Sequence, residues 1–79
     1  MRKPSQKLLD NLAMNVRYFR LKHGLSQEQL AEQCGLHRTY IGSIERGERN
    51  ATLSTLEVLS ETLNVSIAQL LNLDRELAQ

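Results

Sequence analysis

Hydrophobic residues recur every three or four positions along the first third of the chain. They are Leu9, Leu12, Ala13, Val16 and Phe19, with mostly polar residues between them. This spacing places the apolar side chains on one face of an α-helix. Gly24 then interrupts the pattern, as glycine commonly does at the end of a helix. The pattern therefore predicts a first helix that ends shortly before Gly24.

Two shorter periodic runs follow, with a second glycine between them. Ser26 and Gln29 stand three residues apart, which is the spacing of a capping box at the start of a helix. The apolar residues are Leu30, Ala31 and Cys34 in the first run, and Ile41 and Ile44 in the second. Gly35 ends the first run, and Gly47 is expected at the C-terminal end of the second. These runs predict two short helices joined by a glycine turn.

Apolar residues return at helical spacing after a polar loop. They are Leu53, Leu56, Leu59 and Leu63 in one run, and Ile67, Leu70, Leu71 and Leu73 in the next. Thr52 precedes the first of these runs, Asn64 closes it, and Ser66 with Gln69 forms a second capping box. The sequence shows no strand-like alternation. It therefore predicts one all-α domain of five short helices over residues 1–79.

The composition narrows the class of protein. A chain of 79 residues with 41% hydrophobic residues can form one small core. The single cysteine, Cys34, excludes an intramolecular disulfide scaffold and is expected to be a small buried residue. No apolar run approaches the roughly 18 residues of a membrane span, and no secretory signal is present, so we expect a cytoplasmic protein.

Charge is distributed unevenly along the chain, although the net charge is only +1. Residues 1–23 contain six basic residues and one acidic residue, a balance of +5, whereas residues 51–79 have a balance of −3. One end of the molecule could therefore face an anionic partner such as nucleic acid. An ordinary solvated surface gives the same pattern, so charge alone identifies no partner.

The two short runs around Gly35 have the pattern of a helix-turn-helix at about residues 26–46. Ala31 is small where the second helix would cross the first, and Ile41 and Ile44 define the inner face of that second helix. The residues then expected to face outward are Thr39, Gly42, Ser43 and Arg46, with Arg38 and Tyr40 at the edges. An exposed small-residue surface would let the helix approach a DNA major groove closely. The alternative is a solvent-exposed helix with an incidental glycine.

The segment LSQEQLAEQCGLHRTYIGSIERGERN resembles the phage lambda-repressor-like family of helix-turn-helix regulators. Within it, RTYI and IERGERN are most similar to the small controller proteins of restriction–modification systems, which are dimeric transcription regulators. The resemblance implies a compact five-helix DNA-binding fold. One residue departs from the pattern, since His37 stands where the family often has Ser, Asp or Thr as a helix N-cap that contacts a phosphate.

The resemblance also implies a set of DNA-contacting residues. They are Gln27 and His37 at phosphates, Arg38, Thr39 and Tyr40 at base edges, and Ser43, Arg46, Arg49 and Asn50 as further contacts. Family members pair an arginine with a glutamate at the positions of Arg20 and Glu45, so we expect a structural ion pair there. An arginine at position 38 can bond to a guanine through two atoms, but a solvated side chain or a phosphate contact is the alternative. For Tyr40, the alternative is a side chain that covers the helix junction.

No enzymatic or metal site is expected. The two histidines have no further Cys or His at ligand spacing, and the sequence has no phosphate-binding glycine loop and no nucleophile with a plausible base. We therefore expect a non-enzymatic protein without a cofactor.

The expected working unit is a homodimer that binds a pseudo-palindromic operator in double-stranded DNA. The candidate interface lies in the C-terminal helices, at about residues 52–73, and consists of Ile67, Leu70, Leu71 and Leu73. RNA polymerase is a further candidate partner, and no membrane partner is expected. Two other interpretations remain open: a phage or plasmid repressor, and an antitoxin-like protein-interaction module with the same fold.

Overall fold

The computed structural model describes residues 3–72. These residues form five α-helices, and no strand occurs among them. The helices are α1 (Gln6–Lys22), α2 (Gln27–Cys34), α3 (Arg38–Glu45), α4 (Leu53–Leu63) and α5 (Ile67–Leu71). The prediction of an all-α fold with five helices is confirmed.

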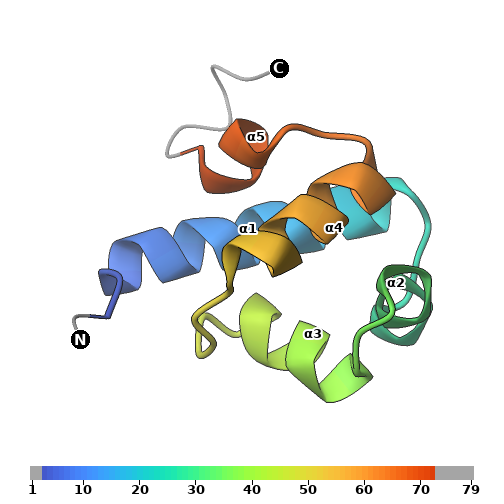
Figure 1. Cartoon of the computed structure of the whole chain (residues 1–79), viewed down its shortest axis with the longest axis horizontal. Coiled ribbons are helices and arrows are strands. Elements are labelled where there is room, and N and C mark those ends of the chain that lie inside the picture. The colour runs from blue at the N-terminus through green and yellow to red at the C-terminus, as the bar shows by residue number, and fades with distance from the viewer. Residues whose placement is uncertain (1–2, 73–79) are drawn as a thin grey trace.

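The helices form three levels around the long helix α1. In Figure 1, α1 and α4 occupy the middle, α5 lies on one side of them, and α2 with α3 lies on the opposite side. α1 packs against both α3 and α5, and α4 packs against α2 and α5. Within the described residues, the rest of the molecule therefore supports the α2–α3 pair on one side only.

The helix boundaries follow local sequence signals. Ser26 and Ser66 each form a complete capping box with the glutamine three residues later, as the sequence predicted. α2 ends at Gly35, which has a φ of 69°, and α4 ends at Asn64, which has a φ of 57°. Glycine adopts this left-handed conformation freely and asparagine tolerates it, so these residues end their helices at little cost.

The core is made of aliphatic side chains from all five helices. The side chains with the least exposure are Val16, Leu30, Ile41, Ile44, Leu59, Leu63 and Leu70. Leu53, the first residue of the apolar run that predicted the fourth helix, is 80% exposed. Leu53 is the first residue of α4, and the core contacts of that helix begin later, with Thr55 and Leu56.

A buried polar contact that no sequence pattern predicted holds α5 in place. Asn15 in α1 is only 2% exposed, and its Nδ2 donates to the carbonyl oxygens of Leu70, at 2.9 Å, and Asn72, at 3.1 Å. Carbonyls at the end of a helix lack partners within the helix. One side chain on α1 thus satisfies two of them and fixes the end of α5 against α1.

Candidate nucleic-acid interface

The inner faces of α2 and α3 form a tightly packed junction. Ala31 is 2% exposed, and Ile41 and Ile44 are 0% and 1% exposed. Between the helices, Leu36 N–H donates to the Ala31 carbonyl at 2.8 Å, which closes the turn around Gly35. This geometry is the helix-turn-helix arrangement in which the second helix, α3, is presented by the first.

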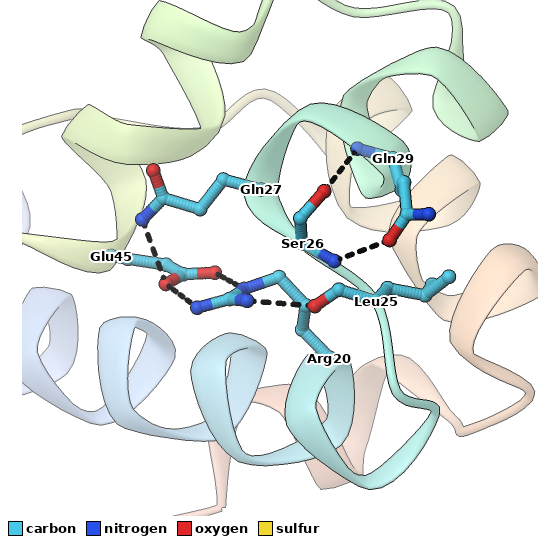
Figure 2. Close-up of polar contacts among 6 residues, drawn as sticks. All are labelled: Arg20, Leu25, Ser26, Gln27, Gln29 and Glu45. Atoms are coloured by element: carbon cyan, nitrogen blue, oxygen red, sulfur yellow. Dashed lines mark hydrogen bonds and ion pairs between the residues drawn. The ribbon is translucent and has the colours of Figure 1, made fainter.

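A buried ion pair fixes the far end of α3 to α1. Arg20 Nε lies 2.6 Å from Glu45 Oε2, and Arg20 Nη2 lies 2.9 Å from Glu45 Oε1. Arg20 Nη1 also donates to the carbonyl of Leu25 at 2.8 Å (Figure 2). The two side chains are 8% and 2% exposed, so this is the pair that the resemblance implied, in a nearly dry setting. A bidentate arginine–carboxylate pair restricts orientation as well as distance.

Gln27 extends this ion pair to the start of α2. Its Nε2 donates to Glu45 Oε1 at 3.1 Å, and Figure 2 shows the three side chains in one connected group. The expected phosphate contact of Gln27 must therefore use the second N–H of its amide or the backbone N–H groups at the start of α2. Glu45 thereby holds α1, α2 and α3 together.

The expected outward exposure of Gly42 and Ser43 is wrong, since both residues are buried. Ser43 Oγ donates to the Tyr40 carbonyl at 2.8 Å and accepts from Arg49 Nε at 3.3 Å. A Cβ at Gly42 would lie 3.1 Å from Arg46 Nη1 and 3.5 Å from Gln27 Oε1. The helical periodicity identified the side away from Ile41 and Ile44 but could not show that long side chains from α2 and the 46–50 loop cover it. Gly42 makes room for those side chains.

The side chains most available to a partner lie at the two ends of α3. Arg38 and Thr39 at the N-terminal end are exposed, and Arg46 follows the C-terminal end. Each arginine has a carboxylate partner that sequence reasoning missed: Glu28 lies 3.4 Å from Arg38, and Glu48 lies 3.0 Å from Arg46. All four side chains are more than half exposed, so these pairs are weak and leave the arginines available to phosphates or bases.

Tyr40 takes part in a contact between α3 and α4. Its hydroxyl lies 3.2 Å from Thr55 Oγ1, and the Arg49 guanidinium lies 5.1 Å from the centre of its ring. This cation–π contact, together with the hydrogen bond to Ser43, holds Arg49 beside α3, which is the recognition helix of the motif. Asn50 is exposed in the same loop. Tyr40 is thus half-buried at the junction of α3 with α4, and its expected contact with base edges stays a prediction.

The candidate dimer residues differ in exposure. Leu70 is 0% exposed and belongs to the protomer core, so its proposed place in the dimer interface is wrong. The short helix α5 has to bury one leucine fully to dock on α1. Ile67 and Leu71 are partly exposed, and Leu73 lies outside the described residues.

Other chemistry is limited in the described part of the chain. Residues 3–72 contain no group of three His, Cys, Asp or Glu side chains that could hold a metal ion. Among the same residues, no helix is both long and apolar enough to cross a membrane. Burial raises the pKa of the Cys34 thiol, and a hydrogen bond with Thr62 acts in the opposite direction. Cys34 is thus an unreactive packing residue.

Comparison with known proteins agrees with this geometry. The family model HTH_3, described as helix-turn-helix, matches residues 16–70. The chain belongs to this lambda-repressor-like family of helix-turn-helix DNA-binding transcriptional regulators. Family membership confirms the predicted class of regulator and the prediction that the chain is not an enzyme.

Several relatives are named as controllers. Control protein C.SmaI of Serratia marcescens is 65% identical over 60 residues, which cover 76% of this chain and 71% of the relative. Control protein C.BamHI of Bacillus amyloliquefaciens is 52% identical over 58 residues, which cover 72% of each chain. The crystal structure of a hypothetical transcription factor from Neisseria has a fold similar to this one, with a TM-score of 0.84. The two sequences are 42% identical, and the structural match covers 99% of this chain and 91% of that one.

Proposed function

We propose that this protein is the controller of a restriction–modification system, and that it binds a pseudo-palindromic operator as a homodimer in the cytoplasm. The main observation that supports the proposal is the difference between the inner face of α3 and its N-terminal end. Its inner face is fixed by Ile41, Ile44 and the Glu45 ion pair, whereas Arg38 and Thr39 at its N-terminal end are exposed. The names of the relatives C.SmaI and C.BamHI support the controller role.

In this proposal the exposed side chains divide into two groups. Arg38 and Thr39 read base edges, because the N-terminal residues of a recognition helix reach the floor of the major groove. The second group holds the DNA backbone, and it consists of Gln27, Arg46, Arg49 and Asn50. His37 acts through the first turn of α3, because its Nδ1 accepts the N–H of Thr39. Ser43 acts indirectly, because its hydroxyl orients Arg49 from a buried position. Phosphate contacts fix the register, and base contacts give the specificity.

The test begins with an operator selected from random duplexes with the wild-type protein. Affinity for that operator and for a scrambled duplex is then measured by fluorescence anisotropy at several salt concentrations. Arg38→Ala should weaken operator binding by about 1–3 kcal/mol and relax the preference at one position. Arg46→Ala should weaken both duplexes similarly and reduce the salt dependence.

Arg17→Ala is the matched control, because Arg17 is an exposed arginine on α1 beside Met14, Tyr18 and Leu21. The Arg17→Ala substitution also removes one positive charge, but it changes no residue of α2 or α3. A failure to enrich any duplex would instead favour the protein-interaction module. If an operator is found, transcription with purified RNA polymerase from a promoter carrying it would test that further partner and distinguish activation from repression.

A further inference from the structure

His37 is the N-cap of the recognition helix α3, and its ring can accept a hydrogen bond there only in some protonation states. Its backbone is extended, with a φ of −80° and a ψ of 141°, and its Nδ1 accepts the backbone N–H of Thr39 at 3.1 Å. An N-cap side chain must supply an acceptor to the free N–H groups of the first turn. A neutral imidazole can do this only when its proton is on Nε2, and a protonated imidazole has no acceptor at all.

The charged groups around His37 come from both helices of the motif. Glu28 and Glu32 of α2 and Arg38 of α3 line the same surface hollow as His37, with Ala31 and Leu36 completing it. Glu28 is itself 3.4 Å from Arg38. The His37 cap lies directly before Arg38 and Thr39, which are the residues proposed to read bases. Loss of the cap would therefore loosen the part of α3 whose position matters most.

We propose that His37 is a positioning residue for Arg38 and Thr39 and that only its neutral form, with Nδ1 unprotonated, holds them in place for sequence-specific binding. Protonation removes the cap and frees the first turn of α3. Histidine is in general the side chain that changes charge between pH 5 and 8, and this sets the pH range of the test. This inference rests on the proposed DNA-binding function. Ser, Asp and Thr, which are common N-cap residues, carry no group that changes charge in that range.

The first experiment needs no DNA and tests the cap alone. The ¹⁵N chemical shifts of the His37 ring in the free protein should show an unprotonated Nδ1 and a protonated Nε2 at pH 7.5. The Thr39 amide resonance should move with the same titration as the pH falls. An Nδ1–H tautomer, or a Thr39 amide that does not follow His37, would overturn the proposal whether or not the protein regulates a gene.

The second experiment measures the ratio of operator affinity to scrambled-duplex affinity between pH 5.5 and 8. For the wild type, this ratio should fall about fivefold at the acidic end, a factor comparable to a typical N-cap contribution. His37→Ser supplies a cap that does not titrate, so its ratio should stay high across the range. His37→Ala should stay low throughout, since it has no cap at any pH.

His23 provides the matched control, because it is the other histidine of the chain. Its Nε2 lies 2.7 Å from the Leu63 carbonyl oxygen and must donate to it, and this contact survives protonation. His23→Gln should therefore keep the wild-type pH profile. An identical profile for wild type and His37→Ser would refute the proposal. The proposal would also be refuted if the operator affinity of the wild type rose in acid while that of His37→Ser did not. The charge on His37 would then act directly on the DNA.

Discussion

Arg20 and Glu45 form a bidentate ion pair that joins the long helix α1 to the end of the recognition helix, with Nε and Oε2 2.6 Å apart. The Glu45 side chain is 2% exposed, and it also accepts from Gln27. A carboxylate this deeply buried needs all of its partners, because water cannot replace any of them. Glu45 thus sets the orientation of α3 together with the buried Ile41 and Ile44.

Glu45→Ala should lower the free energy of unfolding by about 3–5 kcal/mol, since it leaves the Arg20 guanidinium buried without its carboxylate. Such a loss is a large part of the total stability of a small domain. Urea denaturation followed by circular dichroism measures it. Replacing both residues, as in Arg20→Met with Glu45→Leu, should cost less than Glu45→Ala alone, because no unpaired charge remains.

Glu48→Ala is the matched control for this prediction. Glu48 also pairs with an arginine, Arg46, but its side chain is 60% exposed. Its loss should therefore change the stability by less than about 1 kcal/mol. Equal losses for Glu45→Ala and Glu48→Ala would contradict the assignment of a structural role to the Arg20–Glu45 pair.

Gly47→Ala should destabilise the protein more than Gly35→Ala does. Both glycines have a φ of about 70°, a conformation that costs other residues roughly 1–2 kcal/mol. A Cβ at Gly35 would meet nothing within 4 Å, whereas a Cβ at Gly47 would lie 2.6 Å from Asp10 Oδ1. The difference between the two variants in urea denaturation therefore measures the crowding at Gly47.

The crowding at Gly47 has an identifiable source. Gln6 Nε2 donates both to Asp10 Oδ1, at 2.8 Å, and to the Gly47 carbonyl, at 3.0 Å, so that α1 holds the loop after α3. In an Asp10→Ala background, the extra cost of Gly47→Ala over Gly35→Ala should disappear. If it persists, the extra cost comes from Gln6, whose Nε2 would lie 3.3 Å from the Cβ, or from the backbone of the loop.

Local signals along the sequence were sufficient to predict the five helices and the helix-turn-helix. The capping boxes at Ser26 and Ser66 and the left-handed stop at Asn64 depend on neighbouring residues only, so the sequence reveals them directly. The pairing of Arg20 with Glu45 was different. It joins residues 25 positions apart and was anticipated only through resemblance to a known family.

Contacts formed by folding explain what the sequence could not predict. Ser43 is buried because Arg49 returns over α3 from the following loop, and helical periodicity contains no information about that return. Leu53 is exposed because it is the first residue of α4, before the buried part of that helix, and Leu70 is buried because α5 packs against α1. Asn15 has no sequence signal at all, since its partners are backbone carbonyls on another helix.

Tyr40→Phe should separate the structural contact of the hydroxyl from a role in DNA binding. The variant keeps the ring against which Arg49 lies and loses only the contact with Thr55 Oγ1. We expect a loss of about 0.5–1.5 kcal/mol in the free energy of unfolding and little change in operator affinity. A loss of affinity of tenfold or more without a loss of stability would instead place the hydroxyl on the DNA.

Tyr40→Ala should have a further effect because it also removes the ring. Arg49 then loses its cation–π contact and keeps only the bond to Ser43. Operator binding should weaken, and the salt dependence should decrease as it does for Arg49→Ala. If Tyr40→Ala and Arg49→Ala act through the same contact, the double variant should show much less than the sum of their separate effects.

The homodimer is expected to use apolar surface that remains exposed after the protomer has folded. With Leu70 assigned to the core, the C-terminal helices still offer Ile67 and Leu71 of α5, which are partly exposed, and the 80% exposed Leu53 of α4. Leu71 also lines an apolar hollow with Leu8, Leu12 and Leu56. A closed dimer requires the same patch on both copies, and these side chains supply one near the more acidic end of the sequence.

Sedimentation at micromolar concentration should therefore show a dimer for the wild type and a monomer for Leu71→Asp, because a carboxylate at the centre of an apolar interface has no partner. Leu53→Asp should weaken the dimer if the interface includes α4 and should leave it intact if the interface is confined to α5. Met14→Asp is the control, since Met14 is 56% exposed on α1 and lies outside this patch. A dimer that survives Leu71→Asp but dissociates with Met14→Asp would move the interface to α1. With either interface, we expect operator half-sites about 34–36 Å apart, because the two recognition helices must enter successive turns of the major groove.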